Sequence, residues 1–293
     1  MSGGTNGGGL VNSGFANSGL ANGTGLERLE GAFTGRKSQG RKALVIYLMA
    51  GDPTVEFTIS LVPRIAEAGA DVVELGFPFS DPIADGPVIQ AAGNRALRHF
   101  SGLDDYLAMV ARIRKATPVP LVLMTHYNPI FRYGEEAFLQ SAAKAGLDGA
   151  ILPDLPVDEA EDWTALARAN GVAPVMLEAP NTDDAHARRI AERSAGFIYM
   201  VSLKGVTGTD VGMGENLAGR VERFRAMGTA TPLAVGFGIS TPEQAKRIGA
   251  LCDGVIVGTG IINRITAAPN TGAAINAAVD YVAELRAALD QPA

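Results

Sequence analysis

The chain has 293 residues, of which 47% are hydrophobic and 19% charged, and its formal net charge at pH 7 is −6. This length fits one large barrel or two modest domains, and the acidic balance argues against a polyanion such as nucleic acid as the main partner. The single cysteine, Cys252, excludes an internal disulfide, and no apolar run approaches the roughly 20 residues that span a bilayer, so we expect a cytoplasmic protein.

The first 25 residues differ in composition from the rest of the chain. They are built almost wholly from Gly, Asn, Ser, Thr and Ala, and no charged residue comes before Glu27. Such a stretch buries too little surface to offset its ordering entropy, and it lacks the basic start and apolar block of a secretory signal. We predict a disordered tail over 1–25, followed by one catalytic domain over 26–293.

Beyond the tail, short apolar runs alternate with longer amphipathic segments. The runs are rich in Val, Ile and Leu and do not alternate in polarity, as expected of strands buried on both faces. The predicted strands are 43–49, 72–76, 119–125, 149–152, 173–177, 197–201, 232–236 and 254–258. The predicted helices are 54–68, 103–115, 135–145, 158–170, 183–193, 215–227, 242–248 and 274–289, with extra helices at 26–33 and 88–99.

Eight strand–helix pairs in about 250 residues predict an α/β fold of the (β/α)₈ TIM-barrel type. The extra helix at 26–33 would cap the bottom of the barrel, directly after the disordered tail. A doubly wound open sheet is the structural alternative, but no GxGxxG motif follows the first strand.

Polar and glycine-rich segments follow the predicted strands, where barrel enzymes bind their substrates. They are Gly51-Asp52-Pro53, 77–87, 126–129, 153–156, 205–208, 237–240 and 259–260. The opposite connections, such as 68–71 and 145–148, are interpreted as plain helix stops. This asymmetry places the functional site at one end of the barrel.

Glu74 is a carboxylate inside an otherwise apolar strand. At the barrel mouth, burial would raise its pKa toward that of a proton shuttle, although a structural glutamate paired with a lysine or a backbone amide fits its position equally well. Asp81 and Asp85 lie in the next loop beside Pro and Gly, where capping of turns is the more common role.

Three glycine-rich loops follow the last three strands, at 205–208, 236–238 and 258–260. Their backbone amides are uncovered by side chains, and such loops after strands 7 and 8 form the common phosphate site of this fold. Thr259 adds a hydroxyl, and Thr207 could hold its loop closed. Tight turns would also explain the glycines, but three adjacent loops favour a phosphate site.

Metal and covalent chemistry have little support in the sequence. The three histidines, His99, His126 and His186, show no metal-ligand spacing, and Cys252 has no partner motif. No predicted strand carries an obviously buried lysine, which disfavours a Schiff-base aldolase. Lys204, beside the strand-6 loop, could attract an anion or be solvated.

The segment 74–87, Glu-Leu-Gly-Phe-Pro-Phe-Ser-Asp-Pro-Ile-Ala-Asp-Gly-Pro, closely resembles the tryptophan synthase alpha family. Shorter motifs at 51–53, 127–129, 153–156, 205–208 and 238–240 follow in the family's order, and the likeness runs from about Leu26 to Leu289. It implies a lyase of tryptophan biosynthesis that splits indole-3-glycerol phosphate into indole and glyceraldehyde 3-phosphate, with Glu74 and Asp85 as its catalytic carboxylates. It implies binding residues at Tyr47, Thr125, Tyr127, Ile151, Leu177, Tyr199, Thr207, Gly208, Gly238, Gly258 and Thr259, of which Gly208 and the last three would contact the phosphate.

The same resemblance implies a partner. In the family, indole passes through a tunnel to a pyridoxal-phosphate β subunit in an α₂β₂ heterotetramer. This sequence offers no pyridoxal site, so we expect no cofactor in this chain and the pyridoxal phosphate in the partner. The segments 78–81 and 128–129, with Asp154, would face the β subunit.

Two positions depart from the family pattern. Gly258-Thr259-Gly260 stands where Gly-Ser-Ala is usual, and the threonine keeps both the hydroxyl and the amide. Glu178 places a carboxylate where a small or apolar residue is common, and the sequence gives no role for it.

Three alternative functions remain. A stand-alone indole-releasing lyase would share this site but need no β subunit. A sugar-phosphate isomerase is disfavoured by the Glu74–Asp85 block, and an inactive activator of the β subunit is disfavoured by the intact carboxylates.

Overall fold

The computed structural model describes residues 23–82, 85–202, 210–236 and 238–291, with the backbone alone for 210–216. Most of the predicted tail therefore lies outside the described residues. The first described helix, α1 (Gly25–Ser38), begins within the range assigned to that tail, and Thr24 and Glu27 form a capping box at its start. Among the described residues no helix is long and apolar enough to cross a membrane.

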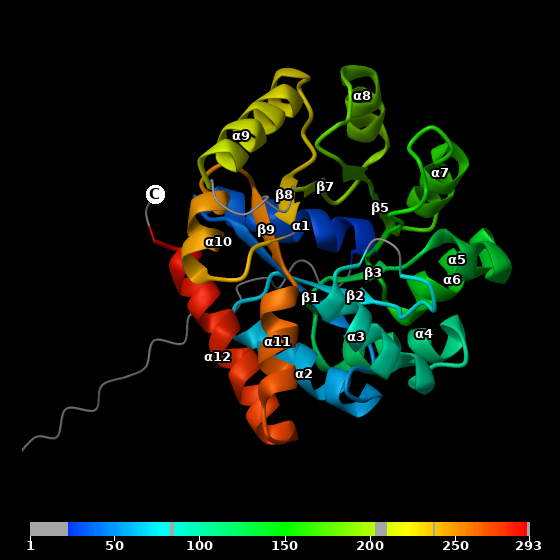
Figure 1. Cartoon of the computed structure of the whole chain (residues 1–293). Helices are drawn as coiled ribbons and strands as arrows, with labels where there is room; N and C mark the ends of the chain where they lie inside the picture. The colour runs from blue at the N-terminus through cyan, green and yellow to red at the C-terminus, as the bar shows by residue number, and fades with distance from the viewer. Residues whose placement is uncertain (1–22, 83–84, 203–209, 237, 292–293) are drawn as a thin grey trace, which may run out of the picture.

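The described strands form a parallel sheet that closes on itself, with a ring of helices outside it (Figure 1). Their order is β5-β4-β3-β2-β1-β9-β8-β7-β6, and every pairing is parallel. The strands are β1 (Ala43–Met49), β2 (Val72–Gly76), β3 (Leu121–Met124), β4 (Gly149–Ile151), β5 (Ala173–Val175), β6 (Leu177–Glu178), β7 (Ile198–Val201), β8 (Leu233–Gly236) and β9 (Gly254–Val257). The predicted TIM barrel is confirmed.

The fifth predicted strand is divided at Met176. Its first part, β5, pairs with β4, and its second part, β6, pairs with β7. The Met176 carbonyl accepts a hydrogen bond from Tyr199 N at 3.0 Å, so the pairing changes sides at this residue. The two ends of the strand order are thus consecutive pieces of one strand, which closes the barrel.

The helices follow the predicted alternation, with two additions. Those after α1 are α2 (Val55–Glu67), α3 (Pro87–Ala96), the 3₁₀ helix η2 (Leu97–His99), α4 (Leu103–Ala116), α5 (Tyr127–Tyr133), α6 (Glu135–Ala145), α7 (Glu161–Ala169), α8 (Asp184–Arg193), α9 (Asp210–Ala226), α10 (Pro242–Gly249), α11 (Thr259–Ala267) and α12 (Thr271–Leu289). The loop predicted at 126–129 is wrong beyond His126, because α5 starts at Tyr127. Pro129 is compatible with that helix because it lies in the first turn, where its missing N–H leaves no bond unmade.

The barrel interior is a separate apolar core within the strands. Alternate residues of each strand point inward, among them Val45, Val72, Val122 and Ile256, all nearly or fully buried. Helix α1 closes the bottom of this core with Leu29 and Phe33. The interior of the barrel is therefore filled from below, up to the carboxyl ends of the strands.

The segments 68–71 and 145–148, which we interpreted as plain helix stops, also carry buried aspartates that form ion pairs. Asp71 and Asp148 precede β2 and β4, are nearly or fully buried, and accept hydrogen bonds from the backbone N–H groups of Leu44 at 2.9 Å and Leu121 at 2.6 Å. Helix α1 supplies Arg36 to Asp71 at 2.5 Å and Arg28 to Asp148 at 2.7 Å, while Arg286 and Arg114 complete the two clusters. These aspartates attach α1 to the bottom of the barrel.

Candidate active site

Glu74 lies on the inner face of β2, level with Tyr47 on β1. Its side chain has no exposed surface, and neither carboxyl oxygen has a hydrogen-bond partner among the described residues. Among the described residues, the structural alternative of a glutamate paired with a lysine or a backbone amide has no support. Burial first, and then the negative charge of Asp85, raise the pKa of Glu74 from 4.5 to about 8.

Asp85 faces the same cavity as Glu74 from the loop that follows β2. Two hydrogen bonds hold the backbone of Asp85. Its N–H donates to the Pro82 carbonyl, and its own carbonyl accepts from the side-chain amide nitrogen of Gln90 at 2.9 Å. Burial raises the pKa of the Asp85 carboxyl, and the charge of His126 opposes that rise. Asp81, by contrast, is exposed and lies outside the lining of the cavity.

Two tyrosines form walls of the cavity, and two glycines make room for their rings. A Cβ atom at Gly76 would lie 2.2 Å from the hydroxyl of Tyr47, and one at Gly236 would lie 2.3 Å from the hydroxyl of Tyr199. Gly236 is thus required by the tyrosine ring. Burial, and then the nearby carboxylates, raise the pKa of Tyr47, which keeps its hydroxyl protonated.

The other end of the cavity is formed by the loops after β8 and β9. Gly238 has a φ of 83°, and a Cβ atom there would meet nothing within 4 Å. Gly258 and Thr259 lie at the start of α11, where no side chain caps the free N–H groups of the first turn. This arrangement suits an anion, because the amides of a helix start attract negative charge. Thr207 and Gly208 lie outside the described residues.

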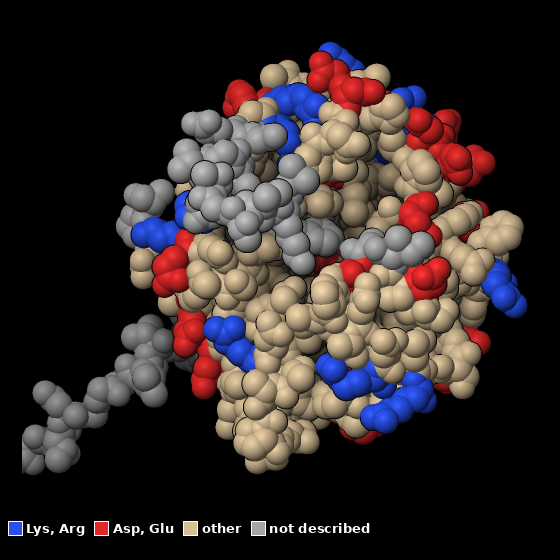
Figure 2. All heavy atoms as spheres, viewed as in Figure 1, with Lys and Arg blue, Asp and Glu red and all other residues tan. Residues whose placement is uncertain are grey.

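The structure gathers seven of the predicted site residues around this cavity. They are Tyr47, Glu74, Asp85, Tyr199, Gly238, Gly258 and Thr259. The mouth of the barrel is hollowed, with acidic side chains at the hollow (Figure 2).

Four other predicted residues lie outside the lining. Ile151 and Leu177 belong to the barrel core. Thr125 is buried with its hydroxyl unpartnered among the described residues. Tyr127 lies on α5, where its hydroxyl donates to Glu135 at 2.8 Å.

Sequence reasoning missed the apolar part of the lining. Met124 and Ile256 sit at inward positions of β3 and β9, and Ile89 and Ile239 come from α3 and the loop after β8. The inward alternation of the strands would have found the first two. Together they give the cavity an apolar side next to its two carboxyl groups.

Known proteins with similar sequences identify the family of this chain. A sequence model of the family described as tryptophan synthase alpha chain matches residues 33–290. The chain belongs to this family. The tryptophan synthase alpha chain of Geobacter sulfurreducens is 45% identical over 246 residues, covering 83% of this chain and 93% of that one. The one from Marinobacter nauticus is 45% identical over 267 residues, covering 90% and 98%.

Solved structures agree with this assignment. The tryptophan synthase subunit alpha of Legionella pneumophila is 38% identical with a TM-score of 0.81, covering 90% of this chain and 98% of that one. A structure of Mycobacterium tuberculosis tryptophan synthase is 34% identical with a TM-score of 0.81, covering 90% and 99%. The chain is a carbon–carbon lyase of tryptophan biosynthesis that cleaves indole-3-glycerol phosphate to indole and glyceraldehyde 3-phosphate.

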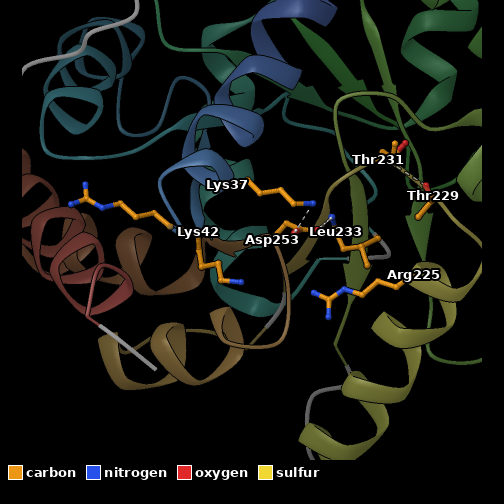
Figure 3. A pocket seen from close by; sticks show the side chains of 10 residues that line it. Lys37, Lys42, Arg225, Thr229, Thr231, Leu233 and Asp253 are labelled. Atoms are coloured by element: carbon orange, nitrogen blue, oxygen red, sulfur yellow. Dashed lines mark hydrogen bonds and ion pairs between the residues drawn. The ribbon is translucent and has the colours of Figure 1, made fainter.

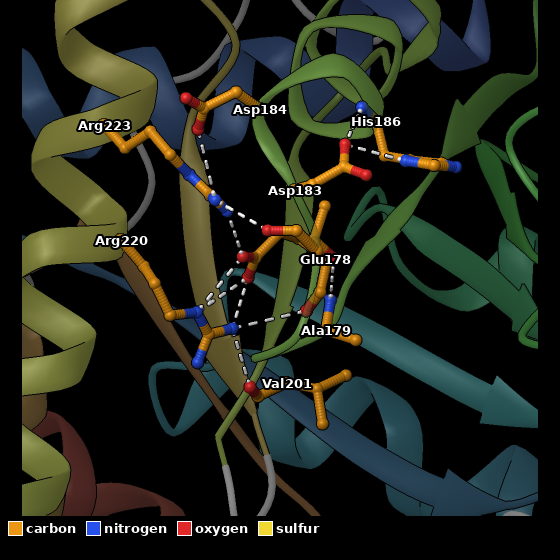
Figure 4. Close-up of polar contacts among 9 residues, drawn as sticks. Glu178, Ala179, Asp183, Asp184, His186, Val201, Arg220 and Arg223 are labelled. Carbon is orange, nitrogen blue, oxygen red and sulfur yellow. Dashed lines mark hydrogen bonds and ion pairs between the residues drawn. The ribbon is translucent and has the colours of Figure 1, made fainter.

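Glu178, which the family pattern left without a role, is buried and forms an ion cluster with two arginines of α9 (Figure 4). Arg220 Nε and Arg223 Nη2, both on α9, donate to its carboxylate at 3.1 Å and 2.8 Å. Arg220 also donates to the carbonyl of Val201, the last residue of β7, at 2.8 Å. Glu178 points away from the barrel interior and ties β6 and β7 to α9.

The histidines take no part in a metal site within the described ranges, where no group of three His, Cys, Asp or Glu could hold an ion. His126 lies 3.4 Å from Asp154, and its ring contacts that of Phe79 at a tilt, with the centroids 4.5 Å apart. His186 is a half-buried helix residue bonded to Asp183.

Proposed function

We propose that Glu74 is the acid–base residue of the cleavage and that Asp85 stabilises the indole while it carries positive charge. The observation behind this proposal is the buried carboxyl of Glu74, unpartnered among the described residues and with a pKa of about 8. A group with that pKa is largely protonated at neutral pH, so it can donate a proton and then take one back.

The chemistry needs both carboxyl groups. Indole is a poor carbanion leaving group, so Glu74 first gives its proton to indole C3 and creates a cationic ring. The bond between C3 and the glycerol carbon then breaks, and its electron pair neutralises the ring. The glycerol hydroxyl on that carbon loses its proton to the Glu74 carboxylate and becomes the aldehyde, which restores the starting acid. Asp85 accepts a hydrogen bond from indole N1–H and favours the cation.

The ends of the cavity suit the two ends of the substrate. The tyrosine walls and the apolar residues would surround the indole, while Gly238, Gly258 and Thr259 would offer amides and a hydroxyl to the phosphate. Binding of the remote phosphate holds the reacting carbon in place beside Glu74.

We further propose that this chain works with a β subunit in an α₂β₂ heterotetramer in the cytoplasm. The family and the solved M. tuberculosis tryptophan synthase structures support a partner. The chain itself would need no cofactor, and pyridoxal phosphate would reside in the β subunit. A stand-alone lyase would instead show high turnover with no partner present.

Indole release by the purified chain tests these roles. Glu74→Gln should retain less than a tenth of wild-type release, because an amide cannot transfer the proton, and Asp85→Asn should be strongly impaired. The control is Asp81→Asn, an exposed carboxylate of the same loop, which should leave the release by the isolated chain unchanged. Near-normal turnover of Glu74→Gln would remove it from proton transfer. Adding a β subunit should stimulate wild type, and no stimulation would favour the stand-alone lyase.

A further inference from the structure

A basic cavity of about 370 Å³ lies at the opposite end of the barrel from Glu74 (Figure 3). It forms where α1 and α9 end and where β1 and β8 begin. Of its ten lining residues four are Lys or Arg, and Asp253 is the carboxylate among them. The family's reaction does not use this end of the barrel, which carries the starts of the strands.

The cations of this cavity come from separate elements. Lys37 lies in the last turn of α1, Lys42 directly precedes β1, and Arg225 lies in the last turn of α9. Figure 3 shows their side chains around Asp253 and Leu233. Since they are far apart in the sequence, only the folded barrel brings them together.

The partners of these cations are mostly neutral. Lys42 Nζ donates to the carbonyl of Cys252 at 2.7 Å, and Arg225 donates to the carbonyl of Leu251 at 3.2 Å. Within the described residues neither has a carboxylate within ion-pair distance. Lys37 is 73% exposed and lies 4.0 Å from Asp253. Arg41, the fourth cation, is paired with Asp290 at 3.6 Å, so its positive charge is already balanced.

Asp253 balances only part of this charge. One of its oxygens accepts a hydrogen bond from the backbone N–H of Leu233 at 3.0 Å, and the other faces Lys37. Asp253 is thus the one lining carboxylate left to balance Lys37, Lys42 and Arg225, and it contacts only Lys37, in a chain whose net charge is −6. Lys37 and Arg225 are exposed and Lys42 is half-buried, so this surplus of two positive charges lines an open cavity, where it attracts an anion of matching charge.

We propose that this cavity binds a small phosphate-bearing anion. A phosphate monoester is a dianion at neutral pH, which matches the surplus. The guanidinium of Arg225 presents planar donors to phosphate oxygens, and the two lysines act as point charges. Thr229 and Thr231 add hydroxyl groups to the lining. This site is separate from the catalytic phosphate position near Gly238, and it does not depend on the proposed mechanism.

The test follows backbone amide resonances while inorganic phosphate, and separately glycerol 3-phosphate, is added at constant ionic strength. We expect the amides of Thr231 and Leu233 to shift and saturate. In the double variant Lys42→Gln/Arg225→Gln the dissociation constant should rise at least tenfold. The matched control is Lys144→Gln/Arg188→Gln, which removes the same charges from exposed positions of α6 and α8 and should bind as wild type does.

The resonances of Gly238 and Thr259 report the catalytic site in the same titration, so the two sites are read separately. Unchanged affinity in the Lys42/Arg225 variant, or no saturating shift at Thr231 and Leu233, would overturn the proposal. Heparin, a long polyanion, is added in a parallel titration. If heparin shifts these resonances and the two small phosphates do not, the proposal is also overturned. If the double variant does not fold, the exposed Lys37→Gln serves instead, with an expected loss of several-fold.

Discussion

Glu74→Gln should make the protein more stable while it removes activity. Glutamine has nearly the shape of glutamate but cannot ionise, so the variant keeps the packing of the site and loses only the titration. The carboxyl of Glu74 is fully buried, and its charged form has lost its water without gaining a donor among the described residues. The folded state therefore disfavours the ionised form, and folding is weakened at any pH where the unfolded chain would ionise.

The magnitude follows from the two pKa values, 4.5 ordinarily and about 8 in the folded chain. Below pH 4.5 both states are protonated, and Glu74 adds no dependence on pH. Between the two values the unfolded chain releases a proton that the folded chain keeps, so wild type loses about 1.4 kcal/mol of stability per pH unit. The accumulated loss is about 3 kcal/mol at pH 7 and levels off at about 5 kcal/mol above pH 9.

Urea unfolding of both proteins at pH 5, 7 and 8.5 measures this effect. The difference in unfolding free energy between Glu74→Gln and wild type should grow with pH, because the loss exists only in wild type. A difference that stays constant across these pH values would refute the raised pKa and the burial argument behind it. The same pKa predicts that wild-type indole release declines as pH rises through about 8, since the proton donor is then lost.

The remaining predictions concern other parts of the barrel. Gly238→Val should weaken binding of glycerol 3-phosphate much more than binding of indole in calorimetric titrations, whereas Gly228→Val, with a similar positive φ in open space, should affect neither ligand. Equal losses for both ligands would instead indicate general damage to the cavity. Asp148→Ala leaves two half-buried arginines without their carboxylate and should cost about 3–5 kcal/mol in urea unfolding; a loss below 1 kcal/mol would show that α1 is held by packing. Glu178→Gln should lower stability by about 2–4 kcal/mol, and an unchanged melting temperature would contradict its role in holding α9.

The barrel itself could be predicted because its signals are local. Largely apolar runs marked the strands, and β1 and β2 were predicted to the residue. The division of the fifth strand could not be predicted, since it depends on which neighbour each half pairs with. The ion pairs of Asp71 and Asp148 were missed for the same reason, because an aspartate two residues after a glycine looks like part of an ordinary turn until α1 brings an arginine to it.

The site was predicted unevenly. The sequence placed Glu74 at the mouth because a charge within an apolar strand is locally visible. It could not show that Gly236 accommodates the ring of Tyr199, because that contact joins two strands. Arg220 and Arg223 also stand far from Glu178 in the sequence, so the cluster is visible only once α9 lies against β6.

The barrel's other buried carboxylates explain why Glu74 marks the site. Among the residues that the structure describes, Asp52, Asp71, Asp148 and Glu178 are buried, and each contacts at least one arginine. The fold thus supplies a cation wherever a buried carboxylate serves stability, as the cost of an unpaired buried charge requires. Glu74 is buried as deeply and receives none. Among the described residues no partner stabilises this carboxyl group, which favours our proposal that Glu74 serves the substrate as a neutral, proton-bearing acid.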